Sequence, residues 1–550
     1  MATWRDRALA RLADEHFDLL VIGGGITGAG VALDAASRGL RVALVERADL
    51  ASGTSSRSSK LVHGGLRYLH QREFALVRES LAERQRLLRN APHLVRPVPF
   101  VIPVFGRAGL ADRAVVSGWS AALWGYDLAG GLRIGYRHRR VGAATVLARL
   151  PGLRPELVTG GFVYHDARAD DARLTLAVAR TAVDHGAVVA TYSPVVALAK
   201  GRYDRVAGAV LADGTPVRAD AVVNATGVWS DGLRELDGDP APPCLRPARG
   251  AHLAIAAERL PWRTAAVLPA GGGRSVFVVP WGAQVYVGTT DTDHAGALDD
   301  PRATADEVTY LLTALNAVLA SPLGPPDVVG SWAGLRPLVA GAAPGPTADL
   351  SRRHRVAVSP SGLITVTGGK LTTYRTMAAD TVDQATRQLH RKPRPTRTGR
   401  LALHGASGTA TLRTDGAAAR LGVPPEVLHH LVDRHGGEVR DIVGLVAADV
   451  GLGRPLVAGL PYLAGEAVWA ARHELVHTLD DVLSRRTRAA VLDAAAAARA
   501  ATAVAGLVGA ELGWSAQHQQ VQVAAFRASV GAERSSAGFD GLALQGAVHQ

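Results

Sequence analysis

Cysteine is nearly absent from this chain of 550 residues, in which Cys244 is the single thiol. One cysteine excludes an intrachain disulfide framework and metal sites built from several thiolates. A chain without disulfides suits a reducing compartment, so we expect a cytoplasmic protein. We predict no residue of the chain as a metal ligand.

Long apolar runs are lacking as well. We find no uninterrupted apolar stretch of the kind that forms a membrane-spanning helix. Residues 1–16 are rich in charge and lack the apolar centre of a signal peptide. We therefore expect neither export nor a membrane-spanning topology. The chain is too long for one ordinary core, which predicts two or three domains.

Lysine is scarce too: it occurs only at positions 60, 200, 370 and 392, although the net charge is +12. The positive charge therefore lies mainly on arginine. We interpret it first as a solvated basic surface and second as a surface that attracts anionic lipid headgroups. Nucleic acid comes third, because we find no recognised binding module and no regular interleaving of aromatic and basic residues.

The chain is organised around the glycine-rich segment IGGGITGAG at residues 22–30. An apolar run precedes it, an alanine-rich helical pattern follows it, and Gly23, Gly25 and Gly28 have G-x-G-x-x-G spacing. A second apolar run, residues 42–45, ends in Glu46. This order of strand, glycines, helix, strand and acidic residue predicts a Rossmann-like dinucleotide site. The pyrophosphate would lie at the helix N-terminus and Glu46 would take the ribose hydroxyls.

We expect three later stretches of the chain to belong to the same domain as this turn. Residues 54–69, TSSRSSKLVHGGLRYL, form a hydroxyl-rich and glycine-rich loop, and loops of this length inside compact domains tend to be functional. The segment NATG at residues 224–227 follows a predicted strand. A last strand at residues 363–366 leads into GGKLTTYR at residues 368–375. The dinucleotide-binding domain is therefore expected to be discontinuous.

The remainder of the chain has other patterns. Short runs within residues 249–340 alternate apolar and polar side chains, which indicates antiparallel strands of a second, substrate-side layer. Beyond a proline-rich linker at 392–397 the sequence is helical to about residue 513. Residues 526–550 have weak periodicity, and we expect a flexible tail there.

Residues 114–126 carry no charge and contain Trp119 and Trp124, and a basic cluster follows within residues 133–140. Indole rings beside guanidinium groups are typical of a helix that lies in a membrane interface. An ordinary buried helix beside a basic loop explains the same residues equally well.

Taken together, these stretches resemble the FAD-dependent sn-glycerol-3-phosphate dehydrogenases, within the glycine and D-amino-acid oxidase superfamily. The resemblance runs from residue 18 to about residue 488. Its most specific pieces are residues 54–69 and 368–375, joined by GLRP at 334–337 and RRTR at 485–488.

The resemblance implies an α/β fold, α+β over the whole chain, with three parts. A Rossmann-like FAD-binding domain would comprise residues 17–95, 141–235 and 356–390. A substrate domain with a mixed sheet would comprise residues 96–140 and 236–355. A C-terminal α-helical cap would span residues 400–525.

The resemblance also implies a set of site residues. A doubly charged phosphate calls for several converging cations, and Arg offers a planar fork where Lys offers a compact point charge. The expected catalytic residues are Arg67, Arg336, Lys370 and His252. The expected substrate-binding residues are Arg67, Tyr68, Arg336, Arg352 and Lys370. The expected FAD-binding residues are Gly23, Gly25, Thr27, Gly28, Glu46, Ser55, Ser56, Ser59, Lys60, Leu61, Thr226, Gly227, Asp291, Gly369 and Thr372.

Some of these roles stay open. Arg352 adjoins Arg353 and Arg355, and the three fit a solvated run equally well. Two histidines in matching motifs, His252 and His63, are candidates for the base that takes the substrate's hydroxyl proton, and sequence does not show reach.

The implied reaction is FAD-dependent oxidation of sn-glycerol 3-phosphate to dihydroxyacetone phosphate, with the electrons passed to a respiratory quinone. The implied setting is the inner face of the cell membrane, where the protein would attach peripherally to an anionic surface and pair as a homodimer. A nucleic-acid partner is not expected. The alternatives are an oxidase of the same family that uses oxygen, and a non-enzymatic or nucleic-acid-associated flavoprotein.

Overall fold

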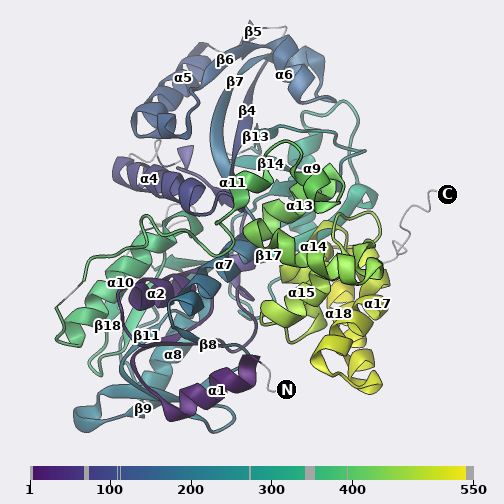
Figure 1. Ribbon diagram of the computed structural model, residues 1–550. Helices are drawn as coiled ribbons and strands as arrows, with labels where there is room; N and C mark the ends of the chain where they lie inside the picture. The colour runs from purple at the N-terminus through teal and green to yellow at the C-terminus, as the bar shows by residue number, and fades with distance from the viewer. Residues whose placement is uncertain are drawn as a thin grey trace.

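The computed structural model describes residues 4–66, 68, 73–107, 110–111, 113–271, 274–340, 353–392 and 394–539. It contains two β-sheets and a helical cap. Figure 1 shows the first sheet with its helices at the lower left, the second sheet at the centre and top, and the cap at the right.

The first sheet has eight strands, in the order β18-β19-β11-β1-β2-β8, and β10 and β9 extend it from β11. The pairs around β1 are parallel: β1 with β2 and β11, β2 with β8, and β11 with β19. The strands are β1 (His16–Ile22), β2 (Val42–Val45), β8 (Val188–Ala190), β9 (Val195–Lys200), β10 (Val206–Leu211), β11 (Pro216–Asn224), β18 (Arg355–Val358) and β19 (Ile364–Thr367).

The apolar run that ends β1 is buried on both faces of this sheet, as parallel strands usually are. Leu19 and Val21 pack into one core with helices α2 (Ile26–Ser37), α7 (Asp171–Asp184) and α10 (Tyr374–Gln388). Leu20 and Ile22 pack into another core with Leu12 of α1 (Trp4–Asp14). Helix α2 contacts both α7 and α10, so the three form a layer on one face.

The second sheet has eleven strands, in the order β16-β12-β15-β14-β13-β4-β7-β3, with β17 paired to β12, β5 to β4 and β6 to β7. Its pairs are antiparallel except β13 with β4, so it is mixed, as predicted. The strands are β3 (Leu61–Val62), β4 (Val95–Arg107), β5 (Leu110–Ala111), β6 (Arg139–Gly142), β7 (Val158–Ala169), β12 (Leu245–Ala256), β13 (Ala265–Pro269), β14 (Ser275–Trp281), β15 (Gln284–Gly288), β16 (Thr292–Asp293) and β17 (Val328–Val339).

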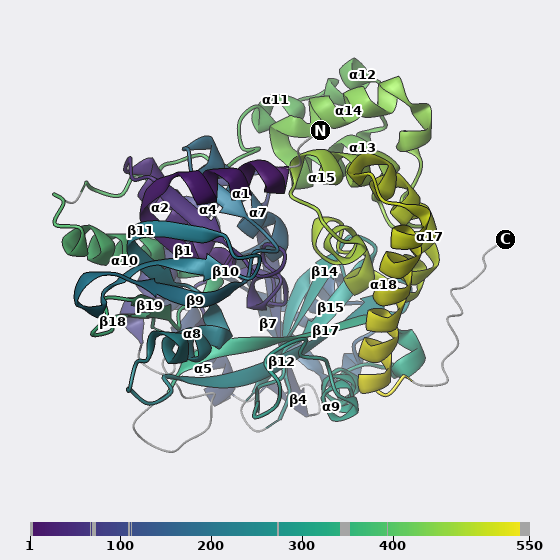
Figure 2. The ribbon, with the colours of Figure 1, turned by 90° about the horizontal axis from the view of Figure 1, so that it is seen from below.

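Further helices cover the two sheets and build the cap. The helices beside the sheets are α4 (Phe74–Asn90), α5 (Arg113–Leu128), α6 (Ala143–Arg149), α8 (Ser230–Asp237) and α9 (Ala305–Asn316). The cap contains α11 (Thr409–Leu412), α12 (Ala417–Leu421), α13 (Pro425–His435), α14 (Val439–Ala448), α15 (Ala464–His473), α16 (Ala489–Leu492), α17 (Ala494–Leu512) and α18 (Ala516–Ser536). Figure 2 shows α17 and α18 side by side along the outer edge of the molecule.

Two expected boundaries differ from the structure. Residues 139–169 belong to the second sheet, because β6 pairs with β7 and β7 pairs with β4, whereas residues 141–235 were assigned to the FAD-binding domain. The tail expected from residue 526 begins inside α18, where Phe526 and Val530 are buried in the cap core. Residues 540–550 lie outside the described residues.

Helix α17 is, by length and composition only, long and apolar enough to cross a membrane. Five alanines begin the helix, and Arg499 and Glu511 lie within it, so no strongly hydrophobic run stands out. In the structure, Ala497, Ala501, Val504 and Val508 of α17 are buried in the cap core, where the helix packs against α15 and α18. The apolar character of α17 is thus used in packing.

Candidate functional site

The turn between β1 and α2 leaves no room for side chains. A Cβ on Gly23 would lie 2.6 Å from the backbone oxygen of Ala225, and one on Gly28 would lie 1.9 Å from the backbone oxygen of Gly23. Gly23 also has a φ of +112°, which side chains disfavour. The glycines therefore let the ends of β1 and β11 and the start of α2 meet closely.

The N-terminus of α2 faces a cavity of 390 Å³, which we call the nucleotide cavity. The backbone N–H of Ile26 donates to Ser55 Oγ at 2.9 Å, so the long loop is attached directly to the helix start. A helix N-terminus with glycines around it suits a pyrophosphate. The cavity is lined by predicted residues from every glycine-rich stretch: Gly23, Gly25, Thr27, Glu46, Ser55, Thr226, Gly227, Gly369 and Lys370.

Glu46 stands at the end of β2 and lines the nucleotide cavity. Its carboxylate accepts hydrogen bonds from the backbone N–H of Gly24 at 2.6 Å and of Ala48 at 2.9 Å. Burial raises the pKa of this carboxyl above its ordinary value, and the two N–H groups oppose the shift. The two hydrogen bonds fix the carboxylate where the dinucleotide fold presents an acidic group to ribose hydroxyls.

A second cavity of 190 Å³, which we call the substrate cavity, adjoins the first. The two share lining residues, among them Ser55, Gly369 and Lys370. The substrate cavity brings together further predicted residues from the segment 54–69, the second sheet and the turn after β19: Ser59, Leu61, His63, Tyr68, His252, Arg336 and Thr372.

Arg336 projects from β17 into the substrate cavity. Its guanidinium donates to Thr289 Oγ1 at 3.0 Å, to the carbonyl of Thr290 at 2.9 Å and to Asp291 Oδ1 at 3.1 Å. These contacts fix the plane of the guanidinium. Asp291 does not line either cavity, and its contact with Arg336 makes it a support for that side chain.

Lys370 lies where the two cavities meet. Its ammonium sits 3.8 Å from the centre of the Tyr68 ring and donates to Ser80 Oγ at 3.2 Å. A cation over an aromatic face gains electrostatic attraction without being neutralised. Lys370 therefore presents its amino group beside both cavities.

His252, on β12, is buried and lines the substrate cavity. Its Nε2 lies 2.8 Å from Ser59 Oγ, and its ring stacks on Trp332 with the ring centres 4.8 Å apart. Burial, together with the charges of Lys60 and Arg336, holds the pKa of His252 well below its ordinary value. The imidazole is therefore neutral at neutral pH.

His63 is the other histidine of the substrate cavity. Its backbone N–H donates to Thr372 Oγ1 at 3.3 Å, and its ring centre lies 6.2 Å from that of Phe277. The structure thus brings both candidate bases to the same cavity, from different elements.

Other predicted residues lie elsewhere. Ser56 is buried behind the loop, and Lys60 turns away from both cavities, with Nζ 3.1 Å from Asp171 Oδ1 and 2.9 Å from the carbonyl of Ser56. The structure therefore does not place Lys60 with the FAD-binding set, because a buried carboxylate holds its ammonium. Arg67 and Arg352 lie outside the described residues.

Sequence reasoning missed the residue that holds the loop at residues 54–69, which we call the flavin loop. Asp171 accepts hydrogen bonds from the N–H and Oγ of Ser58 at 3.0 and 2.7 Å, and it also pairs with Lys60 and with Arg488 of the cap. Asp171 is the first residue of α7, where negative charge is favourable for the helix alone, so its position does not reveal its other partners. The RRTR segment at residues 485–488 was a signal, since several adjacent arginines need carboxylate partners when buried.

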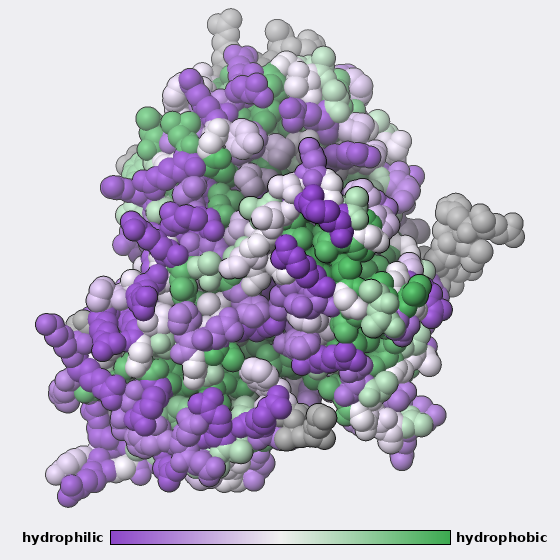
Figure 3. Space-filling model, viewed as in Figure 1, coloured by the Kyte–Doolittle hydropathy of each residue, from purple (hydrophilic) through white to green (hydrophobic). Residues whose placement is uncertain are grey.

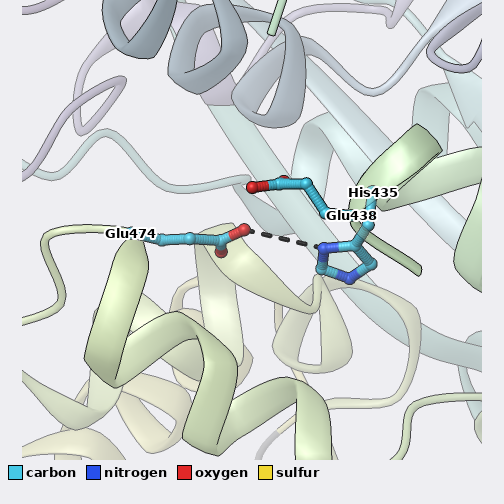
Figure 4. Close-up of side chains that lie close together, drawn as sticks. All are labelled: His435, Glu438 and Glu474. Carbon is cyan, nitrogen blue, oxygen red and sulfur yellow. Dashed lines mark ion pairs between the residues drawn. The ribbon is translucent and has the colours of Figure 1, made fainter. Parts of the chain in front are cut away.

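A cluster in the cap resembles a metal site. Ligand atoms of His435, Glu438 and Glu474 lie within 4.8 Å of one another (Figure 4). Arg173 donates to both carboxylate oxygens of Glu474 at 2.7 Å, and Arg180 donates to both of Glu438 at 2.8 and 2.6 Å. These arginines supply the positive charge, so the cluster is an ion-pair network between α7 and the cap.

Comparison with known proteins agrees with a site made of a nucleotide cavity and a substrate cavity. Residues 18–375 match the family model for FAD dependent oxidoreductases, and residues 396–519 match the C-terminal domain of alpha-glycerophosphate oxidase. Glycerol-3-phosphate dehydrogenase 2 of Mycobacterium tuberculosis (strain ATCC 25618 / H37Rv) is 43% identical over 538 residues, which cover 96% of this chain and 90% of that protein. The chain belongs to the FAD-dependent glycerol-3-phosphate dehydrogenases.

Two more members of the family extend the comparison. The mitochondrial glycerol-3-phosphate dehydrogenase of Rattus norvegicus is 36% identical, over 92% of this chain and 72% of its own length. The crystal structure of the glycerol-3-phosphate dehydrogenase from Bacillus halodurans complexed with FAD aligns with a TM-score of 0.79 at 30% identity, covering 98% of this chain and 99% of that one. The predicted family, fold and FAD cofactor are thereby confirmed.

Proposed function

We propose that this chain oxidises sn-glycerol 3-phosphate to dihydroxyacetone phosphate and passes the electrons to a membrane quinone. The observation that carries the proposal is the junction of two cavities at Lys370. One cavity has the glycine turn and acidic residue of a dinucleotide site, and the other has a fixed guanidinium beside a histidine.

The nucleotide cavity fits FAD. A Cβ on Gly25 would lie 3.1 Å from Ser55 Oγ, so the glycine keeps the space at the helix N-terminus open for a phosphate. Gly23, Gly25 and Thr27 would hold the pyrophosphate, Glu46 the ribose, and Thr226, Gly227 and Gly369 the part nearer the substrate cavity. The bound flavin supplies the acceptor for the substrate's hydride.

Arg336 and Lys370 would bind the substrate's phosphate and orient its carbon chain, together with Arg67 and Arg352. Arg336 contributes a positive charge whose position is fixed by its protein partners, and Lys370 contributes a point charge at the flavin side of the cavity. Tyr68 would close this side of the site, since it already contacts Lys370.

The proton of the substrate hydroxyl would leave through Ser59 and His252. Ser59 Oγ lines the cavity and lies 2.8 Å from His252 Nε2, so Ser59 can take the hydroxyl proton while giving its own to the imidazole. Because its pKa is held low, the His252 ring is uncharged beforehand, with one nitrogen free to accept a proton, and it releases the acquired proton readily. His63 is the competing base.

The test is anaerobic mixing of the purified holoenzyme with glycerol 3-phosphate, glycerol and an amino acid in turn. Glycerol 3-phosphate should bleach the visible flavin absorbance within a turnover, and the two compounds without phosphate should not. A protein that stays colourless with added FAD would contradict the proposal. Steep salt-dependent RNA binding without bleaching would instead favour the non-enzymatic flavoprotein.

The same mixing experiment distinguishes the two histidines. In His252→Asn the rate of bleaching should fall by roughly 10²-fold or more, as expected for loss of a general base. In His63→Asn the rate should fall less. The opposite order would assign the base to His63.

The electron acceptor distinguishes a dehydrogenase from an oxidase. After bleaching, a soluble quinone analogue should restore the flavin colour faster than dissolved oxygen does. Stoichiometric release of peroxide during turnover would support the oxidase alternative and overturn the quinone proposal.

The membrane face we propose is α5 and the turn after it. Apolar side chains there are unusually exposed: Val115 by 45%, Trp124 by 40%, Leu128 by 77%, Leu132 by 48% and Tyr136 by 52%. Figure 3 shows hydrophobic side chains among hydrophilic ones in this upper left region. Peripheral insertion of this face on the cytoplasmic side would bury apolar area.

Basic residues lie beside this apolar face. The guanidinium of Arg137 stacks 4.0 Å from the ring centre of Trp124, and both side chains line a cavity of 920 Å³ with Arg139 and Arg140. Each basic side chain near an anionic membrane adds about 1 kcal/mol of attraction. Indole and guanidinium together match the headgroup layer.

Neutralising this basic cluster should weaken membrane binding. The triple variant Arg137→Gln, Arg139→Gln, Arg140→Gln should bind phosphatidylglycerol vesicles at least tenfold more weakly in a sedimentation assay, from about 1 kcal/mol per charge. The control is Arg397→Gln with Arg400→Gln, two exposed arginines away from α5, and it should bind as the parent does. Unchanged binding by the triple variant would show that the protein attaches to the membrane through another part of its surface.

A further inference from the structure

A third cavity, of 280 Å³, lies between the second sheet and the cap, and we call it the cap cavity. Its walls come from β4, β7, the hairpin of β14 and β15, and α13. None of its lining residues lines the nucleotide or substrate cavity. Four cations line it: Lys60, Arg96, Arg168 and Arg434.

Two of these cations face each other across a strand pair. Arg96 of β4 is the direct register partner of Arg168 of β7. Like charges directly opposite one another in an antiparallel pair are destabilising. Such a pair therefore requires negative charge nearby.

The protein supplies that negative charge to one arginine of the pair. Arg96 forms an ion pair with Asp433 of α13. The guanidinium of Arg168 donates to the carbonyl of Pro280, and among the described residues no carboxylate lies within 4.0 Å of it. Burial lowers the pKa of Arg168, and burial with the charges of Arg413 and Arg168 lowers that of Arg96 to about 9. The cavity thus holds more positive charge than its own acids offset.

The acids on the other side of the cavity are already shared. Asp170 pairs with both Arg434 and Arg488, and Asp171 pairs with both Lys60 and Arg488. Burial, followed by the charge of Arg488, lowers the pKa of Lys60 to about 8. These carboxylates therefore do not offset Arg168.

Two buried polar atoms of residues lining the cavity lack partners within the described part of the chain. They are Arg96 Nε and Nδ1 of His93. Burial lowers the pKa of His93 to about 3, so its imidazole is neutral and able to donate a hydrogen bond. Buried polar groups normally have partners, so such atoms indicate a missing ligand.

From these contacts we propose that the cap cavity is a second anion site, which takes a small phosphate dianion, either inorganic phosphate or a phosphate monoester. Opposed guanidinium groups offer planar forks that match phosphate oxygens. The volume is at the small end for ligand cavities, which favours a ligand of few atoms.

A ligand there would act on both the cap and the flavin loop. Arg434 belongs to α13 of the cap, while Arg96 and Arg168 belong to the second sheet, so one anion would join the two. Lys60 donates to the carbonyl of Ser56, and Tyr286, which lines the same cavity, donates to the carbonyl of Ser59 at 2.8 Å. The anion would therefore stabilise the back of the loop whose front lines the substrate cavity.

The test uses Arg336→Leu holoenzyme as the parent, so that phosphate bound in the substrate cavity does not contribute. Inorganic phosphate should raise its Tm by a few degrees relative to sodium chloride of equal ionic strength. Adding Arg168→Gln should abolish the rise, and adding Arg259→Gln, at an exposed arginine in the turn after β12, should leave it unchanged. An equal rise with and without Arg168→Gln would overturn the site.

Two further arms complete the experiment. Glycerol 2-phosphate in place of inorganic phosphate distinguishes the sources, because the compound that gives the larger rise at equal concentration is the preferred ligand. Crystals of the unaltered holoenzyme soaked in tungstate should show anomalous density between Arg96 and Arg168, whether or not the variants fold. Density confined to the substrate cavity would contradict the proposal.

Discussion

Replacing Arg336 by leucine is expected to lower kcat/KM for glycerol 3-phosphate by roughly 10²-fold or more. Truncating one partner of a desolvated, hydrogen-bonded charge pair costs about 2–5 kcal/mol, and each 1.4 kcal/mol is about tenfold. The loss should appear in steady-state kinetics with a soluble acceptor. The flavin content should stay unchanged, because Arg336 lines only the substrate cavity.

Two comparison variants make the Arg336 result specific. Arg336→Lys keeps the charge and loses the fork, so it should recover only part of the activity. Arg259→Leu removes an arginine that is half exposed, lies in the turn after β12 and pairs with Asp327 just before β17, and it should behave as the parent. If Arg336→Leu kept the parent's preference for glycerol 3-phosphate over glycerol, Arg336 would not bind the phosphate.

Replacing Asp49 by alanine is expected to destabilise the protein by about 3–5 kcal/mol, the usual cost of removing one partner from a buried ion pair. Asp49 is fully buried, and its carboxylate accepts from Arg485 at 2.6 Å and twice from Arg486 at 2.7 Å. The change would leave two buried guanidinium groups short of negative charge. Urea unfolding followed by circular dichroism measures the loss.

The Asp49 contact also predicts a pH dependence. Burial alone would raise the pKa of Asp49, but Arg486 and Arg485 hold it below its ordinary value. Its stabilisation is therefore complete at neutral pH and is lost as the pH falls through the lowered pKa. The unaltered protein should lose stability on acidification more steeply than Asp49→Ala does.

An exposed pair provides the control for Asp49. Asp299 pairs with Arg47 at the surface, where ion pairs contribute about 0–1 kcal/mol. Asp299→Ala should therefore unfold within that margin of the parent. An equally small effect for Asp49→Ala would mean that the cap is not held to the flavin domain through Arg485 and Arg486.

The sequence predicted the first sheet well, because its signals are local. The apolar run before Gly23 and the strand at residues 42–45 are periodic patterns with glycine or acidic ends, and the structure has β1 and β2 there. The sheet to which β7 belongs was not predictable in the same way. Its pairing with β4 joins residues that are about sixty positions apart, and strand partners leave no local pattern.

The site residues also differ in whether local sequence predicts them. Residues that act through backbone shape or through a strand end, such as Gly23 and Glu46, follow from motif spacing. Lys60 lies in the same specific loop, yet its direction depends on Asp171, a helix residue more than one hundred positions away. The scarcity of lysine singled out Lys60 and Lys370 equally, and only the fold distinguishes the one that pairs with a buried carboxylate from the one that lines both cavities.

The return of the chain to its first sheet affects how the protein is made. While the ribosome is still synthesising the second sheet, β11 has its partner β1 but lacks β19, which comes from Ile364–Thr367. The last residues of β11, Val223 and Asn224, therefore lack their parallel partner until β19 has been made, and unpaired strand edges promote wrong pairing. Gly369 and Lys370, which line the nucleotide cavity, are synthesised directly after β19. The cavity is therefore complete, and the cofactor can bind there, only when about two thirds of the chain has emerged.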